Sequence, residues 1–212
     1  MAGTTSHDDA DHPNPWQRLD DLYAVRPPWD IGRPQPAFLD LARSGAIRGR
    51  VLDVGCGTGE HVLMCADLGL DATGMDLAAT ALRSAEDKAR RRGSAVRFLH
   101  HDARRLGELG EQFDTVLDSG LFHLLDPDDR AAFTGGLLAV LRPGGRYFML
   151  CFSDREPRVS GAVGPHRLTR ADIAAAFADG LRIDFIEPAT IEITLDPAGI
   201  RAWRVGMTRV TA

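Results

Sequence analysis

Apolar residues recur along the chain with two different periods, and each period predicts one kind of element. Short, nearly continuous apolar runs predict five strands, at residues 51–54, 71–75, 95–99, 114–118 and 146–152. Apolar residues spaced three and four apart predict helices at residues 16–23, 60–68, 77–91, 128–141 and 170–177, and another around Phe38. Strands and helices therefore alternate, which is typical of a parallel sheet with connecting helices.

The pattern changes to apolar and polar alternation near the C-terminus. Apolar and polar residues alternate in residues 181–187 and 203–210. Little separates these two runs except Pro188 and the turn Asp196-Pro-Ala-Gly199. No crossover helix fits between these runs, so we expect an antiparallel hairpin. The whole pattern predicts an α/β fold, with a doubly wound, Rossmann-like seven-stranded sheet, helices on both faces and a C-terminal antiparallel hairpin.

The chain of 212 residues is long enough for one well-buried core. Residues 1–14 are polar and rich in Asp and His, so we expect a flexible tail there, followed by a single domain at residues 15–212. Residues 26–36 carry four prolines and are not expected to form regular structure.

The composition limits the partners and the compartment. A net charge of -5 argues against a nucleic acid or an anionic membrane as partner, because both favour a basic surface. Three cysteines without regular spacing make no disulfide framework and favour a reducing compartment. No apolar run is long enough to span a membrane and no signal core is present, so we expect a cytoplasmic protein.

A glycine-rich segment follows the first predicted strand, in Val51-Leu-Asp-Val-Gly-Cys-Gly-Thr-Gly-Glu60. A mononucleotide loop would need Lys-Ser or Lys-Thr after the glycines, and a dinucleotide loop would need glycine where Glu60 stands. A third ligand, S-adenosylmethionine, has no phosphate to bind. For it, Gly55, Gly57 and Gly59 would permit close backbone approach, and carboxylates at Asp53 and Glu60 would suit its cationic groups.

Two further carboxylates stand at strand ends. Asp76 ends the second strand, where it could accept hydrogen bonds from both ribose hydroxyls; the alternative is a cap for the helix that follows, and both can hold. Asp102 follows the third strand and is placed to accept a hydrogen bond from an adenine amino group. We expect the neighbouring Leu77 and Ala103 to contact the cofactor as well.

Five segments resemble the motifs of class I methyltransferases, in the same order along the chain and with the same spacing. They are residues 51–59, Asp76, His101-Asp-Ala103, Phe113-Asp-Thr-Val-Leu-Asp118 and Leu141-Arg-Pro-Gly-Gly145. The resemblance implies S-adenosylmethionine as cofactor and S-adenosylhomocysteine as product. In that setting Cys56 is expected to pack beneath the cofactor, and Asp118 and Ser119, at the end of the fourth strand, are expected to contact cofactor or substrate.

A narrower resemblance lies upstream. Pro28-Trp-Asp-Ile-Gly-Arg-Pro-Gln-Pro36 resembles the N-terminal signature of the thiopurine and thiol methyltransferase branch. Together with residues 118–123 and 151–157, it is similar to actinobacterial enzymes that methylate heterocyclic toxins. This resemblance implies that residues 15–48 form a cap and that Trp29 lies near the sulfonium or the methionine moiety. Without the resemblance, Trp29 would more often be a packing anchor.

Methyl transfer is an in-line displacement at an activated carbon, so the site must mainly align the reactants and exclude water. We consider His123 and Asp154 as catalytic candidates, because both follow strand ends. His123 could instead be a core or helix-start histidine, and Asp154 a turn residue.

The expected substrate contacts are Tyr23, Trp29, His123, Phe152 and His166, although His166 could be an exposed loop residue. We predict no metal, because the adjacent His100 and His101 would point to opposite faces of a strand.

The leading hypothesis is a methyltransferase acting on O, S or N of a small aromatic heterocycle, phenol or thiol, in detoxification or natural-product tailoring. The expected partner is a small-molecule acceptor, with no nucleic acid and no membrane, and the protein is expected to be a monomer or homodimer. Two alternatives stay open: a cofactor-binding regulatory protein without catalysis, and a nicotinamide-dependent oxidoreductase.

Overall fold

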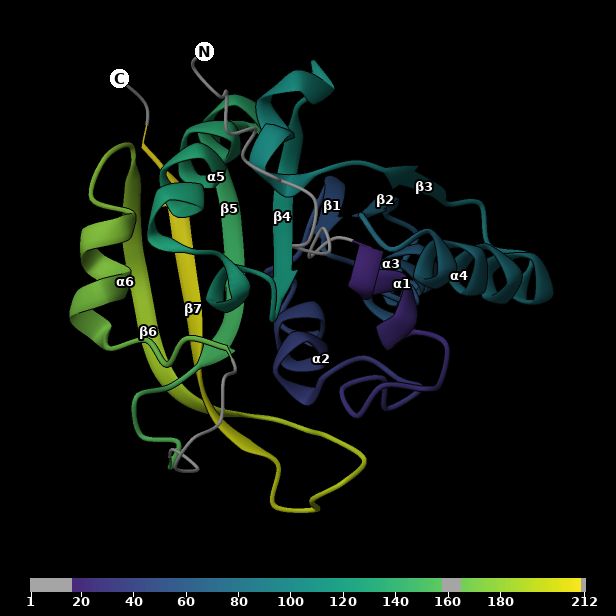
Figure 1. Cartoon of the computed structure of the whole chain (residues 1–212). Helices are drawn as coiled ribbons and strands as arrows, with labels where there is room; N and C mark the ends of the chain where they lie inside the picture. Colours follow the sequence, from purple (N-terminus) through teal and green to yellow (C-terminus); the bar gives the residue numbers. More distant parts are fainter. Residues whose placement is uncertain (1–16, 158–164, 211–212) are drawn as a thin grey trace, which may run out of the picture.

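The computed structural model describes residues 17–157 and 165–210, and a seven-stranded sheet forms its centre (Figure 1). Its strands are β1 (Arg50–Val54), β2 (Asp71–Asp76), β3 (Arg97–His100), β4 (Phe113–Ser119), β5 (Leu141–Phe152), β6 (Leu181–Ile191) and β7 (Ile200–Arg209). The order across the sheet is β3-β2-β1-β4-β5-β7-β6. The first five strands are parallel, whereas β7 is antiparallel to both β5 and β6. The predicted doubly wound sheet with a terminal antiparallel hairpin is confirmed.

Helices cover both faces of the sheet, as predicted (Figure 1). The helical elements are α1 (Gln17–Leu22), α2 (Pro36–Arg43), α3 (Glu60–Asp67), α4 (Ala79–Arg92), η1 (Ala103–Leu109), η2 (Phe122–Leu124), α5 (Pro127–Val140) and α6 (Arg170–Ala176). Phe38 of α2 and Val62 of α3 belong to one buried cluster, and Phe133 of α5 and Ile173 of α6 belong to the other. The predicted flexible tail at residues 1–14 lies outside the described residues.

The start of β5 differs from the prediction. The sequence predicted a helix to residue 141 and a strand only from residue 146, and the predicted start of the strand was wrong. The strand begins at Leu141, which pairs with Phe113, and the register shifts before Thr115 pairs with Arg146. Gly144 has a φ of 74°, a conformation that glycine adopts without steric cost, so the extra residues fit into the ladder as an irregularity.

The strand β6 continues through Pro188 to Ile191, beyond the predicted end at Glu187. Proline lacks the N–H needed for a ladder on both sides, which is why it favours edge strands. Because β6 pairs only with β7, Pro188 has an open edge and the strand need not stop.

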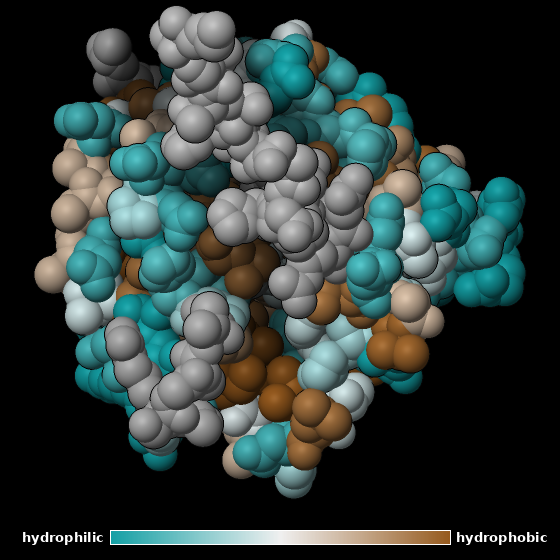
Figure 2. All heavy atoms as spheres, in the orientation of Figure 1, coloured by the Kyte–Doolittle hydropathy of each residue, from teal (hydrophilic) through white to brown (hydrophobic). Residues whose placement is uncertain are grey.

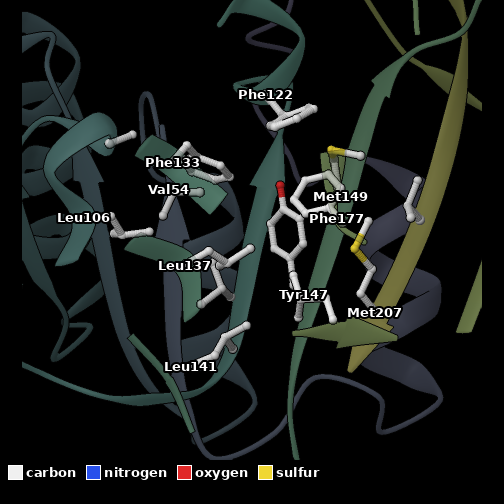
Figure 3. Packing of buried hydrophobic residues seen from close by; sticks show 14 of the residues in the cluster. Val54, Leu106, Phe122, Phe133, Leu137, Leu141, Tyr147, Met149, Phe177 and Met207 are labelled. Carbon is white, nitrogen blue, oxygen red and sulfur yellow. The ribbon is translucent and has the colours of Figure 1, made fainter. Parts of the chain in front are cut away.

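Aromatic residues around β5 link the core to the edge of the sheet (Figure 3). Tyr147 is fully buried, and its ring packs against Phe133 of α5 and Phe177, which directly follows α6. Phe177 in turn packs against Phe122 of η2. The Tyr147 hydroxyl donates a hydrogen bond of 2.8 Å to Asp118 near the end of β4. The core thereby fixes the chain at the point where β4 leaves the sheet.

Candidate active site

The glycine loop turns sharply out of β1. Gly55, Gly57 and Gly59 have φ values of 67°, 52° and 83°, which residues other than glycine rarely adopt. A Cβ atom on Gly57 would lie 3.0 Å from the Tyr23 hydroxyl oxygen. The loop therefore needs glycine both for its backbone conformation and because Tyr23 of the N-terminal segment lies directly against it.

Asp76 connects this loop to the start of α4. One carboxylate oxygen accepts a hydrogen bond from the Gly57 N–H and the other from the Ala78 N–H, each at 2.8 Å. Burial raises the pKa of Asp76, and these backbone donors oppose the rise. Each carboxylate oxygen has a second lone pair. Asp76 can therefore hold the loop and still accept hydrogen bonds from ribose hydroxyls.

Asp53, which precedes the loop in β1, has a carboxyl group that is buried without a hydrogen-bond partner among the described residues. Its side chain is 1% exposed, and within the described part of the chain neither carboxylate oxygen has a hydrogen-bond partner. Burial raises the pKa of Asp53 well above its usual range, with the charges of Asp118 and Asp76 adding to the rise. The Nδ1 atom of His61 is 3.8 Å from Asp53, too far for a good hydrogen bond.

The other ring nitrogen of His61 is bound by the backbone of Gln35. Its Nε2 accepts a hydrogen bond of 3.2 Å from the backbone N–H of Gln35, so the proton of the neutral ring must sit on Nδ1, toward Asp53. Burial lowers the pKa of His61 to about 4, which keeps the ring neutral. An unpartnered buried carboxyl group under a glycine loop fits a cofactor that carries cationic groups.

The predicted adenine contact, Asp102, has a strong partner of its own. Its carboxylate forms a bidentate contact with Arg104, with 2.6 Å between Oδ2 and Nη2, and accepts the Arg104 N–H at 2.9 Å. Ala103 and Cys56 are buried, and the Leu77 carbonyl accepts a hydrogen bond from His100. Their contacts with a cofactor stay predictions.

Asp118 lies deeper than the other acidic candidates. Its carboxylate accepts hydrogen bonds from the Leu121 and Phe122 N–H groups, at 2.8 and 3.1 Å, as well as from Tyr147. Burial raises its pKa to about 6, and these donors oppose the rise. Asp118 thus shapes the turn from β4 into η2, while Ser119 is half-buried at the strand end. A cofactor or substrate contact for either residue stays a prediction.

That turn places His123 between the carboxyl ends of β4 and β5. The side chain is 4% exposed and its ring lies 4.3 Å from the Phe152 ring, centroid to centroid. Nδ1 accepts a hydrogen bond of 3.1 Å from the Phe152 N–H, and the His123 carbonyl accepts one of 2.8 Å from the His166 N–H. The structure therefore brings three predicted substrate residues together at one edge.

Tyr23 and Trp29 form an aromatic pair on the other side of the glycine loop. Their rings meet edge to face with centroids 6.2 Å apart, and the indole N–H lies 3.4 Å from the Tyr23 oxygen. Trp29 is 46% exposed, so it is not a core anchor. Burial raises the pKa of Tyr23, with the nearby Asp76 charge adding to the rise, so the phenol is neutral.

The other two candidates have partners elsewhere. Asp154 is exposed and accepts a hydrogen bond of 3.2 Å from the Trp203 indole. The exposed His166 has its Nε2 3.4 Å from a carboxylate oxygen of Asp126. Their catalytic and substrate roles stay predictions.

Sequence reasoning missed the residues that hold residues 23–35, a part of the predicted cap at residues 15–48, in place. The Gln35 side chain donates to the Glu192 carbonyl at 3.0 Å and accepts from the Glu192 N–H at 2.8 Å. Arg33 pairs with the Glu192 carboxylate, and the Thr194 N–H donates to the Pro28 carbonyl at 2.8 Å. No periodicity or motif links positions 157 residues apart, so the sequence alone carries no signal for this contact.

A cavity of about 610 Å³ lies between the cap and α4. Tyr23 and Thr58 line it, together with Lys88, whose ammonium group contacts Thr58 and Glu60 at 2.8 and 2.7 Å. The lining does not include Asp76 or His123, so this cavity lies beside the sheet edge rather than at it. Among the described residues, no cluster of His, Cys, Asp or Glu could hold a metal ion, and no helix could cross a membrane.

Comparisons with known proteins agree with this geometry. A methyltransferase domain profile matches residues 51–145, which span the glycine loop, Asp76 and the β4 edge. The chain is 34% identical over 169 residues to the 2-heptyl-1-hydroxyquinolin-4(1H)-one methyltransferase of Mycobacteroides abscessus, covering 79% of this chain and 74% of that protein. It is 32% identical over 128 residues to the probable thiol methyltransferase 2 of Arabidopsis thaliana, covering 59% and 56%.

Solved structures show the same fold. One, described as the conversion of a disulfide bond into a thioacetal group during echinomycin biosynthesis, matches with a TM-score of 0.83 and 35% identity over 92% of both chains. A Burkholderia thailandensis 1,6-didemethyltoxoflavin-N1-methyltransferase with S-adenosylhomocysteine bound matches with a TM-score of 0.69 and 22% identity, over 92% of this chain and 84% of that one. The fold and the loop define a methyltransferase site. The chain belongs to the class I S-adenosylmethionine-dependent methyltransferases.

Proposed function

We propose that the acceptor is a small aromatic heterocycle, phenol or thiol, methylated on oxygen, sulfur or nitrogen. The aromatic character of the carboxyl edge carries this proposal: the cap contributes Tyr23 and Trp29, β5 contributes Phe152 at its end, and η2 contributes the His123 ring. Figure 2 shows apolar side chains in a hollow near the point where β4 ends. Flat apolar molecules with a few polar groups suit such surroundings. The relatedness to a hydroxyquinolinone methyltransferase supports the same class.

The cofactor supplies an activated methyl group on a positively charged sulfur. The chain's own residues hold and orient the reactants. The bare backbone of the glycine loop would permit close approach of the cofactor, and Asp76 would accept hydrogen bonds from its ribose hydroxyls with the lone pairs that Gly57 and Ala78 leave free. The buried Asp53 carboxyl has no hydrogen-bond partner among the described residues, and a cationic group of the cofactor near it would favour its ionised form. The cap excludes water from the reaction, and the strand ends align the acceptor.

The same proposal includes further assignments. Leu77, Asp102, Ala103, Asp118 and Ser119 are proposed to complete the cofactor site, and Trp29 to cover the methyl group. The net charge of -5 supports a small-molecule acceptor rather than a nucleic acid. We also propose a cytoplasmic location, and a monomer or homodimer as the active form.

A labelled-cofactor assay tests the proposal. The protein is incubated with methyl-labelled S-adenosylmethionine and a panel of quinolones, N-hydroxyquinolones, phenols and aromatic thiols, and products are identified by mass spectrometry. We expect at least one aromatic acceptor to gain the labelled methyl group, and the Asp76→Ala variant to lose this product. Tight cofactor binding without any methylated acceptor would instead favour a regulatory protein without catalysis.

A further inference from the structure

The hydrogen bond from Phe152 fixes where the proton of His123 sits. A backbone N–H can only donate, and Nδ1 of His123 accepts this N–H at 3.1 Å, so Nδ1 must carry a lone pair. The neutral ring therefore carries its proton on Nε2. In this tautomer Nε2 is a hydrogen-bond donor and has no lone pair with which to take a proton.

The Nε2 atom is open to the space at the sheet edge. The ring edge with Cε1 and Nε2 faces Gly120, because a Cβ on that glycine would lie 3.4 and 3.8 Å from these atoms. Within the described part of the chain, Nε2 has no hydrogen-bond partner. Among the described residues, only Asp53 and Arg130 have side-chain atoms that are both fully buried and without a partner. The unpartnered Nε2 of His123 therefore keeps some exposed surface. The free N–H is therefore reached from outside the core.

The surroundings of His123 favour an anion. Burial is the main cause that lowers the pKa of His123 to about 3, and the nearby His166 and Arg130 contribute to the same shift. The central carbon of the Arg130 guanidinium lies 5.3 Å from the centre of the Phe122 ring, and its buried Nε and Nη2 atoms have no hydrogen-bond partner among the described residues. Asp172 lies within reach of the Arg130 charge, but the two unpartnered guanidinium nitrogens leave a positive potential beside His123 that a negatively charged group would relieve.

We infer that His123 binds the acceptor as a hydrogen-bond donor through Nε2–H rather than as a base, and that the preferred acceptors are already anions: N-hydroxy heterocycles, acidic phenols and aromatic thiols. This inference rests on the proposed function. The acceptor loses its proton to the solvent before it binds. Its lone pair then forms the bond to the methyl carbon, the carbon–sulfur bond breaks, and that electron pair stays on sulfur.

Two substitutions separate a donor from a base. Glutamine can place an amide N–H near the position of Nε2, whereas leucine has a similar size and no donor. We expect His123→Leu to lower kcat/KM for 4-nitrophenol or an N-hydroxyquinolone on the order of 100-fold, by analogy with removal of one donor from an anion site. His123→Gln should stay within about tenfold of the wild type, since it keeps that donor. Equal loss in both variants would overturn the donor role.

The pH profile gives a second readout. With a series of phenols of graded acidity, the midpoint of kcat/KM against pH should move with the ionisation of each free phenol. A midpoint that stays at one pH for every phenol would show a base on the enzyme and contradict the inference.

Two measurements do not depend on turnover. Nitrogen-15 NMR of the labelled histidines should show His123 neutral with its proton on Nε2 from pH 5 to pH 8; a proton on Nδ1, or titration within this range, would overturn the inference. With S-adenosylhomocysteine present, 4-nitrophenol should bind as the yellow phenolate, and more weakly to His123→Leu. If the wild type methylates no panel member while both results hold, the proposed function fails but the anion site stands.

Discussion

The proposed cofactor side and the proposed acceptor side of this sheet edge are built in different ways. On the cofactor side, Asp76 is fixed by the N–H groups of Gly57 and Ala78, and all three belong to the first two βα units. On the acceptor side, η2, the end of β5 and residue 166 meet at His123, and the hairpin tip at Glu192 holds the cap. Local backbone geometry therefore defines the cofactor side, whereas long-range contacts define the acceptor side.

This difference implies that the two sides will respond differently to mutation. A change on the cofactor side should abolish binding of one ligand that the whole family shares. A change on the acceptor side should alter which molecules react, or how firmly the cap closes, while cofactor binding persists.

The largest effect is expected for Asp76→Ala. The variant loses the proposed acceptor for ribose hydroxyls and leaves the Gly57 and Ala78 N–H groups without their partner, so the affinity for S-adenosylhomocysteine should fall on the order of 100-fold. Isothermal titration calorimetry measures this. The matched control is Asp71→Ala, an exposed aspartate at the start of the same strand, which should leave affinity unchanged. Equal affinities for both variants would remove Asp76 from the ribose.

Acid should destabilise the fold through the two buried histidines. The pKa values of His61 and His123 lie near 4 and 3, below the value of about 6.5 in the unfolded chain. Their contribution to stability is therefore fully present above pH 6.5 and is lost as pH falls toward the folded values, by about 1.4 kcal/mol per pH unit for each residue. The raised pKa of Asp118 acts in the opposite direction between about pH 4 and 6.

A variant isolates the histidine contribution from that of Asp118. In His61→Gln, the unfolding free energy from urea titrations at pH 5, 6 and 7 should fall less steeply with acid than in the wild type. Glutamine is chosen because its amide oxygen can accept the Gln35 N–H in place of Nε2. Parallel curves for the two proteins would show that His61 is not held neutral by burial.

Tyr147→Phe tests the link between the core and the β4 turn. The substitution removes the hydroxyl that donates to Asp118 and leaves the aromatic packing in place. We expect a loss of about 1–2 kcal/mol in the free energy of unfolding, because a buried carboxylate loses one of its donors. The pKa of Asp118 should rise further, which carboxyl NMR can follow. An unchanged stability would mean that this hydrogen bond is not needed to hold the turn.

The smallest effect is expected where the cap meets the hairpin. Gln35→Ala removes both hydrogen bonds to Glu192 and should cost about 0.5–1 kcal/mol in stability, because water can replace part of these bonds once the cap loosens. The KM for acceptors should rise a few-fold, as expected when a lid closes less firmly. Gln112→Ala, at an exposed glutamine, is the control. A KM equal to that of the control would show that the hairpin tip does not position the cap.

The same comparison explains what could be predicted from the sequence. Alternating periods and the glycine loop predicted the sheet, its hairpin and the position of Asp76, because each depends on neighbouring residues. The sequence could not reveal that Asp102 pairs with Arg104, or that Asp118 points into the core toward Tyr147, because side-chain partners depend on the folded structure. It also could not show the tautomer of His123, which is fixed by an N–H that lies 29 residues away.

One measurement tests the central claim that this chain transfers a methyl group to a small aromatic acceptor. Protein loaded with one equivalent of S-adenosylmethionine is mixed with a single equivalent of an N-hydroxyquinolone, quenched over time and analysed by mass spectrometry. We predict that the methylated acceptor and S-adenosylhomocysteine appear together at the same rate and in equal amounts. A bound cofactor that stays intact, or S-adenosylhomocysteine that forms without methylated acceptor, would contradict this account.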